Sequence, residues 1–210
     1  MTEVREQEPE FLDDLAGAHA DKLREFAADL FNRGELLGLI GPLEPARLWT
    51  RHIINSALLA PLLRENGTLA DIGSGGGFPG IVLAALRPDV QIRLIEPMER
   101  RCAWLHEQRT NLRLDNVEVL RGRAEEYHGA FEVQQVTARA VTALRKLLPI
   151  TAPLLENGGE MLFLKGQGID AEIAAAQKQL QRARVRNYEV HVLGQEITEP
   201  TRVFRGTVAR

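Results

Sequence analysis

Residues 69–80 read Leu-Ala-Asp-Ile-Gly-Ser-Gly-Gly-Gly-Phe-Pro-Gly, and they are the most informative part of the chain about its fold. Residues 68–72 are mostly apolar, as in a buried strand, and residues 81–86 after the glycines favour a helix. Glycines let the backbone turn sharply and approach a ligand closely, and Pro79 suits a first helical turn. A glycine-rich loop between a strand and a helix is typical of a nucleotide site. A tight turn without any ligand is the alternative.

Beyond this loop the chain alternates short apolar runs with helical stretches. The expected strands cover residues 68–72, 90–95, 117–120, 133–137 and 160–164, and the expected helices cover residues 81–86, 100–112, 140–154 and 171–183. This alternation predicts an α/β fold with a doubly wound, mostly parallel sheet of Rossmann-like type. Two more strands, at 187–193 and 203–209, have no helix between them and should pair antiparallel at an edge, which makes seven strands.

The first 66 residues have a different texture and predict helices. Leu23, Phe26 and Leu30 recur at helical spacing, Gly34 is a plausible stop, and residues 48–63 follow a second helical period. This part holds 7 Lys and Arg against 12 Asp and Glu, whereas residues 67–210 hold 19 against 17, most of the 19 being arginines. We expect an N-terminal helical extension over residues 1–66 and a ligand-binding domain over residues 67–210, within one compact unit.

Composition excludes several classes of protein. The 210 residues are 44% hydrophobic and 26% charged, with a net charge of -3, which is ordinary for a globular protein. A single cysteine, Cys102, excludes an internal disulfide framework and a cysteine-based zinc cage, and no metal site is expected. No run approaches the ~18 apolar residues of a membrane span. The acidic N-terminus lacks the apolar core of a signal peptide, so we expect a cytoplasmic protein without a membrane partner.

Asp71, at the end of the first expected strand, distinguishes between two known glycine motifs that this loop could match. The pattern Gly75-x-Gly77-x-x-Gly80 matches the dinucleotide fingerprint, but its first glycine lies well past the strand. The pattern Asp71-x-Gly73-x-Gly75-x-Gly77 starts at the strand end and resembles motif I of the class I S-adenosylmethionine-dependent methyltransferases. A carboxylate there suits a ligand with an ammonium group, whereas a pyrophosphate would need hydrogen-bond donors.

Two further acids follow the next strands. Glu96 lies 23 residues after Gly73, a spacing at which an acid accepts hydrogen bonds from both ribose hydroxyls. NAD enzymes use the same device, so Glu96 predicts a nucleoside ligand without choosing the cofactor; a plain surface glutamate is the alternative. After the third strand, Glu125 could reach the adenine amino group, or it could be a charge that caps a helix.

With these residues in place, the chain resembles the RsmG (GidB) family of 16S ribosomal RNA guanine-N7 methyltransferases. The resemblance extends from about residue 35 to 166 and rests on residues 51–56, 71–80, 123–125, 138–140 and 164–166, of which the Gly-Phe-Pro-Gly and Ala-Arg-Ala segments are the most specific. Asn55 departs from the family, which more often has Asp there. The resemblance implies S-adenosylmethionine as cofactor and a pocket lined by Gly73, Phe78, Ala124, Glu125 and Arg139, with Asp71, Gly75 and Glu96 in support.

The residue types also limit the methyl acceptor. Residues 137–140 read Thr-Ala-Arg-Ala and lack the Asn/Asp-Pro-Pro-aromatic motif that handles exocyclic amines. Methylation at carbon 5 of a pyrimidine needs a cysteine nucleophile, but Cys102 lies in the middle of a helix, where a buried structural thiol is the more common case. Guanine N7 has a free lone pair and no proton, so its methylation needs alignment rather than a general base. We therefore expect no acid–base residue.

Cationic residues provide candidates for the RNA side of the site. Arg139, at the end of the fourth expected strand, can contact the cofactor or the O6/N7 edge of guanine; capping a helix or pairing with Glu125 is its alternative. Arg123 and Lys165 are candidates for phosphate contacts, although Lys165 beside a glycine could be a turn residue. Arg51 and His52 are adjacent and cannot share a helix face, so one should face the RNA and the other should pack.

The resemblance and these residues together predict an S-adenosylmethionine-dependent methyltransferase that acts, as a monomer, on N7 of a guanine in 16S ribosomal RNA, as free RNA or within the small ribosomal subunit. A small-molecule methyltransferase with the same cofactor loop is an alternative, which predicts no response to RNA. A module that binds the cofactor without catalysing methyl transfer is the second alternative.

Overall fold

The sheet of this protein has seven strands in the order β3-β2-β1-β4-β5-β7-β6. The structure is a computed structural model and describes residues 5–209. All neighbours pair in parallel except β7, which runs antiparallel to both β5 and β6. The doubly wound, mostly parallel sheet predicted from the sequence is confirmed. The strands are β1 (Thr68–Ile72), β2 (Gln91–Glu96), β3 (Val117–Arg121), β4 (Val133–Arg139), β5 (Leu155–Lys165), β6 (Val185–Leu193) and β7 (Thr201–Val208).

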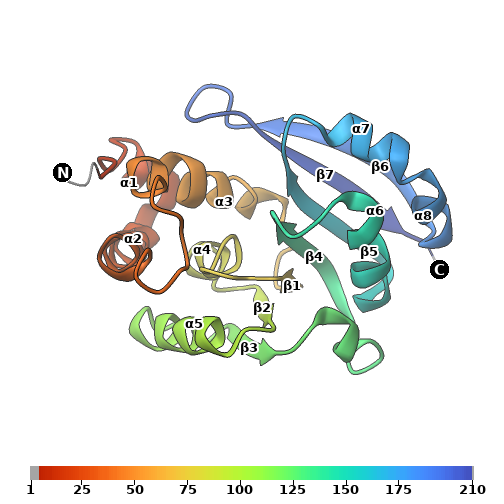
Figure 1. Cartoon of the computed structure of the whole chain (residues 1–210), viewed down its shortest axis with the longest axis horizontal. Helices are drawn as coiled ribbons and strands as arrows, with labels where there is room; N and C mark the ends of the chain where they lie inside the picture. Colours follow the sequence, from red (N-terminus) through yellow and green to blue (C-terminus); the bar gives the residue numbers. More distant parts are fainter. Residues whose placement is uncertain (1–4, 210) are drawn as a thin grey trace.

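Two layers of helices cover the two faces of this sheet (Figure 1). The first layer contains α1 (Leu12–Ala16), α2 (Ala20–Arg33), α3 (Asn55–Ala57), α4 (Gly80–Leu86) and α5 (Glu99–Asn111). The second contains α6 (Leu144–Thr151), α7 (Ile169–Ala175) and α8 (Gln177–Arg182). Side chains alternate along the strands between the two apolar cores: Leu69 belongs to the first and Ala70 to the second.

The N-terminal helices pack directly on the glycine loop. Along α2, the apolar side chains of Leu23, Phe26 and Leu30 are fully buried, because they recur on one helix face. The Phe26 ring lies 5.5 Å from the Phe78 ring, centre to centre, and 6.4 Å from the Trp104 ring of α5. The first 66 residues therefore share a core with the loop that follows them.

Three predicted helices are shorter or more broken than expected. The segment 48–63 is divided into η3, a π-helical segment at Leu48–Ile54, then α3, and then a 3₁₀ turn, η4 (Ala60–Leu62). The helix expected at 140–154 begins only at Leu144, because Ala140 has a positive φ of 54°. The helix expected at 171–183 is interrupted between α7 and α8. Further 3₁₀ turns are η1 (Gly17–His19), η2 (Pro45–Arg47), η5 (Ala124–Tyr127) and η6 (Ala152–Leu154).

The two tail strands form the expected antiparallel pair, with β6 at the edge and β7 between it and β5. The loop between them packs against η3, where Thr198 Oγ1 donates to the carbonyl of Thr50, 3.0 Å away. Among residues 5–209, no helix combines the length and apolar character needed to cross a membrane.

Candidate active site

The glycine loop adopts, at several positions, a backbone conformation that favours glycine. Gly73 and Gly75 have φ of 69° and 55°, in the left-handed region. At Gly80, where α4 begins, an added Cβ would lie 2.2 Å from Leu94 and 2.6 Å from the Asp71 carboxylate. The loop therefore needs glycine both for its turn and for the close approach of α4 to the sheet.

A cavity of about 380 Å³ lies against this loop, at the carboxyl ends of β1, β2 and β4. It is the position at which open α/β sheets bind their ligands. Five residues singled out from the sequence line it, namely Gly73, Gly75, Phe78, Glu96 and Arg139. Leu39, Met98, Arg101 and Val141 also line it and were not anticipated.

Glu96 connects the loop to β2. Its side chain is 2% exposed; Oε2 accepts a hydrogen bond from the Gly75 amide and Oε1 accepts one from the Met98 amide, both at 2.9 Å. The Arg101 guanidinium lies 4.0 Å from Oε2. A carboxylate oxygen has two lone pairs, so Glu96 fixes the loop and keeps acceptor capacity toward the cavity.

Asp71 lies behind the loop and does not line the cavity. It is completely buried, and its Oδ2 accepts a hydrogen bond from the Gly80 amide at 3.0 Å, while Oδ1 has no partner. Burial raises the pKa of Asp71 to about 7. The structure thus places this carboxylate under the start of α4, whereas the sequence suggested direct contact with a ligand.

Ala124 and Glu125 lie in η5, after β3. Ala124 is buried in the second core and Glu125 is exposed, and neither lines the cavity. Their contact with a cofactor stays a prediction. Cys102 is buried, and its thiol donates to the carbonyl of Glu96, 3.0 Å away. Burial also raises the pKa of that thiol, which agrees with a structural rather than a nucleophilic cysteine.

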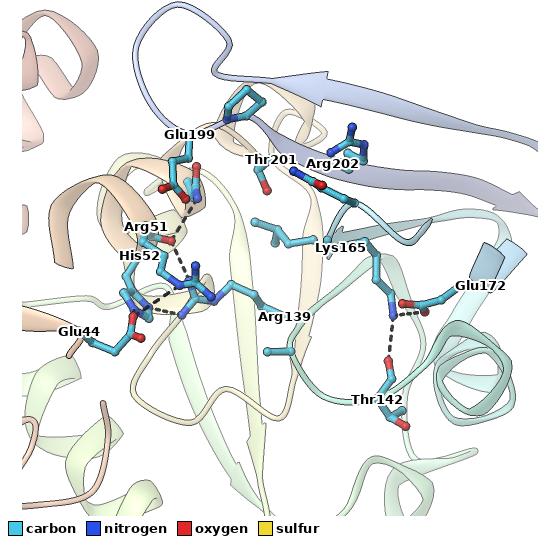
Figure 2. Close-up of a pocket in the computed structure, with 16 residues that line it drawn as sticks. Glu44, Arg51, His52, Arg139, Thr142, Lys165, Glu172, Glu199, Thr201 and Arg202 are labelled. Carbon is cyan, nitrogen blue, oxygen red and sulfur yellow. Dashed lines mark hydrogen bonds and ion pairs between the residues drawn. The ribbon is translucent and has the colours of Figure 1, made fainter. Parts of the chain in front are cut away.

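A second and larger cavity, of about 630 Å³, adjoins the first. Its walls come from η3, the ends of β4 and β5, and the loop before β7, as Figure 2 shows. Arg139 and Ala140 line both cavities. Of the predicted RNA residues, Arg51, His52 and Lys165 line the second one. Arg123 does not; it is exposed beside η5.

Arg139 lies at the boundary between the two cavities. Its guanidinium donates to the carbonyl of Arg51 at 3.1 Å and to Nδ1 of His52. The same group lies 4.8 Å above the centre of the Phe78 ring, a cation–π contact. Burial lowers the pKa of Arg139 to about 10, so it stays charged at neutral pH. Arg139 does not pair with Glu125, the alternative suggested by the sequence.

His52 is buried and bound on both ring nitrogens. Nδ1 contacts Arg139 and Nε2 contacts the carboxylate of Glu44. Burial, together with the charge of Arg139, lowers the pKa of His52 to about 4. Although burial opposes it, hydrogen bonds from His52 and Arg47 hold the pKa of Glu44 below its ordinary value. Of the adjacent pair, His52 therefore packs, while the Arg51 side chain is 47% exposed.

Lys165 is held by its neighbours. Its ammonium donates to the carbonyl of Thr142 and to the carboxylate of Glu172, each at 2.8 Å, and its side chain is only 9% exposed. Although burial opposes it, hydrogen bonds from Lys165 and from the Leu144 amide keep the pKa of Glu172 low. Lys165 thus ties α7 to the loop before α6 (Figure 2).

Sequence reasoning missed four charged residues of the second cavity: Glu44, Glu172, Glu199 and Arg202. Glu199 and Arg202 come from the β6–β7 hairpin, and nothing in their local sequence indicates that the hairpin returns to the site. Glu44 lies in the turn before η2, and no spacing rule connects it with His52.

Comparison with solved structures places this fold among the methyltransferases. The structure of TYW2 from M. jannaschii in complex with AdoMet matches with a TM-score of 0.60 at 19% identity, over 76% of each chain. The fold is that of the class I S-adenosylmethionine-dependent methyltransferases, as the sequence predicted.

The sequence comparisons are more specific. The family model described as rRNA small subunit methyltransferase G (GidB) matches residues 19–201. Two relatives named Ribosomal RNA small subunit methyltransferase G are a Clavibacter michiganensis subsp. michiganensis protein, 54% identical over 98% of each chain, and a Leifsonia xyli subsp. xyli protein, 53% identical over 99% of this chain and 100% of its own. The chain belongs to the rRNA small subunit methyltransferase G family, which confirms the resemblance.

Proposed function

We propose that this protein transfers the methyl group of S-adenosylmethionine to N7 of a guanine in 16S ribosomal RNA. The main observation is the shared wall: Arg139 and Ala140 separate a nucleoside-type cavity from a polar second cavity. The names of the relatives support a small-subunit ribosomal RNA as the substrate.

The first cavity fits S-adenosylmethionine. Glu96 would accept hydrogen bonds from the ribose hydroxyls, since each of its oxygens accepts only one bond in the structure, from the Gly75 amide and from the Met98 amide. The turn at Gly73 and Gly75 leaves backbone, and no side chain, against the cofactor. Above its pKa of about 7, Asp71 adds negative charge behind the loop, which favours a ligand with an ammonium group. We expect Ala124 and Glu125 to approach the adenine. When bound, this cofactor supplies an electrophilic methyl group.

The second cavity would hold the guanine. Arg139 faces both cavities, and its guanidinium can donate to O6 beside N7. The Phe78 ring beneath it and the bonds to Arg51 and His52 restrict its movement. In model reactions, holding the reactants in the right orientation lowers the activation barrier by roughly 7–11 kcal/mol. Alignment of the guanine with the methyl group can therefore supply much of the catalysis.

The side chains of the second cavity also favour an acceptor that has no proton to lose. His52 is bound on both nitrogens, Glu44 accepts from His52 and Arg47, and Glu172 accepts from Lys165. Glu199 is exposed on the loop before β7. No histidine or buried carboxylate among the described residues of this cavity is free to act as a general base. Guanine N7 needs none.

Arginines at the cavity mouth suit the RNA backbone. Arg51 is 47% exposed, and Arg202 lines the cavity without an ion pair to any described residue. We propose that these two contact phosphates. Arg123, outside the cavity and exposed, would contact RNA only beyond the target nucleotide, and Lys165 would act mainly through its bond to Glu172.

We further propose that the protein acts as a cytoplasmic monomer on the RNA or on the small ribosomal subunit. Residues 1–66 would then form a helical extension that supports the glycine loop, and residues 67–210 the catalytic domain.

Incubation with labelled cofactor and separated ribosomal fractions tests this proposal. We expect label in the 16S RNA of the small-subunit fraction and none in the large-subunit RNA. Transfer to small metabolites with no response to RNA would favour a small-molecule methyltransferase. Cofactor binding without any transfer would indicate a non-catalytic module.

A further inference from the structure

Glu44, His52 and Arg139 form a chain of hydrogen bonds in the wall of the second cavity (Figure 2). The side chains of Glu44 and His52 are 17% and 10% exposed. The chain begins beside η2, passes through η3 and ends at the carboxyl end of β4. It therefore links the N-terminal part of the molecule to the residue between the two cavities.

The donors and acceptors of this chain can be assigned from its ends. A guanidinium has only donors and a carboxylate only acceptors. Nδ1 of His52 must therefore accept from Arg139, and Nε2 must carry the proton that it donates to Glu44. A protonated His52 would direct a second donor at Arg139, and its pKa of about 4 agrees with a neutral ring.

Glu44 is itself held in place. Its Oε1 accepts from Arg47 at 2.6 Å, and its Oε2 lies 3.5 Å from Nε of Arg51. Arg139 has no carboxylate within salt-bridge distance among the described residues. Asp71 acts on it through space, whereas Glu44 is the carboxylate that reaches it through hydrogen bonds.

We propose that Glu44 is a positioning residue: it fixes His52 as a hydrogen-bond acceptor and so holds the Arg139 guanidinium over Phe78, between the cofactor and acceptor cavities. This inference rests on the proposed function, in which Arg139 aligns the guanine with the methyl group. Glu44 touches neither reactant in this scheme and transfers no proton.

Glu44→Gln is the informative variant. The glutamine amide can donate to Nε2 of His52, which would move the ring proton to Nδ1 and direct it at Arg139. A hydrogen bond to a charged group contributes about 1.5–3 kcal/mol, so we expect single-turnover methyl transfer to fall between about tenfold and a hundredfold. In an Arg139→Ala background, Glu44→Gln should cost little more, because coupled residues are not additive.

Glu6→Gln is the matched control. Glu6 also anchors η3, through Thr50 Oγ1 at 2.7 Å and the Thr50 amide at 3.1 Å, but it does not touch His52. It should lower the melting temperature and leave the transfer rate near that of the unmodified protein. If Glu44→Gln does not fold, Glu44→Asp is used in its place. This variant keeps the negative charge but has a side chain too short to reach His52.

The ¹⁵N spectrum of the histidine rings gives a readout that does not depend on activity. We expect an Nε2–H ring at His52, shifted toward Nδ1–H by Glu44→Gln and unchanged by Glu6→Gln. An unchanged ring in Glu44→Gln, or additive rate losses with Arg139→Ala, would overturn the positioning role. If the unmodified protein methylates no RNA, the proposed function fails, while the spectrum still decides whether Glu44 sets the His52 ring.

Discussion

Asp71 provides a test of the cavity's electrostatics that needs no RNA. Its carboxylate is fully buried under α4, with one oxygen bound to the Gly80 amide and the other without a partner. Burial raises its pKa from the ordinary 3.8 to about 7. Asp71→Asn removes the ionisation and keeps the shape of the side chain.

The sign and size of the effect follow from this pKa. The folded protein holds the Asp71 proton more tightly than the unfolded chain does. The contribution of this proton to the free energy of unfolding is therefore fully present below about pH 4 and is lost as the pH rises through about 7. The raised pKa corresponds to about 4 kcal/mol. The asparagine amide would occupy the position of the unpartnered oxygen and lose about 1–3 kcal/mol.

Urea unfolding without cofactor at pH 5 and pH 8 measures how the ionisation of Asp71 and the asparagine amide each change the free energy of unfolding. We expect the stability of Asp71→Asn relative to the unmodified protein to rise by about 2–3 kcal/mol from pH 5 to pH 8, so that the variant is the more stable of the two at pH 8, by about 1–3 kcal/mol. The same variant should bind S-adenosylhomocysteine more weakly, because it lacks the charge that favours an ammonium group. A variant that is less stable than the unmodified protein by the same amount at both pH values would show that the pKa of Asp71 is not raised.

Calorimetry should show binding of S-adenosylhomocysteine and none of NAD, and Gly73→Val should abolish binding, because φ is 69° and the new Cβ would lie 2.9 Å from Val141; tighter binding of NAD would reverse the cofactor assignment. RNA affinity should fall with salt, and Arg202→Ala should reduce the slope by about 0.7 log units per log unit of salt if that arginine contacts one phosphate of a single strand; an unchanged slope would remove it from the interface. Single-turnover transfer should be flat from about pH 7.5 to 9, also in Arg139→Ala, since the pKa values of His52 and Arg139 are about 4 and about 10; a rise with pH that His52→Ala abolishes would require a general base.

The sequence predicted the features that depend on local pattern. The alternation of strands and helices, the glycine loop and the acid at the end of β2 all follow from short-range rules, and the structure places Gly73, Gly75, Phe78, Glu96 and Arg139 around one cavity. The antiparallel tail was also predictable, because two strands without a helix between them must reverse direction.

What escaped prediction depends on contacts between distant segments. Arg202 and Glu199 reach the second cavity only because the hairpin loop folds back against η3, where Thr198 bonds to Thr50. The sequence places Asp71 at a strand end but does not specify its face, which directs the carboxylate at Gly80 rather than into the cavity. Lys165 is bound by Glu172, a pairing that no local spacing rule indicates.

The identity of the methylated nucleoside shows whether this protein methylates guanine N7. Small-subunit RNA labelled by this protein with S-adenosylmethionine would be digested to nucleosides and separated against methylated standards. We predict that all of the label appears as 7-methylguanosine, since every histidine and buried carboxylate among the described residues of the acceptor cavity is already held by hydrogen bonds. Label in an N-methylated exocyclic amine, or in a methylated pyrimidine, would contradict it.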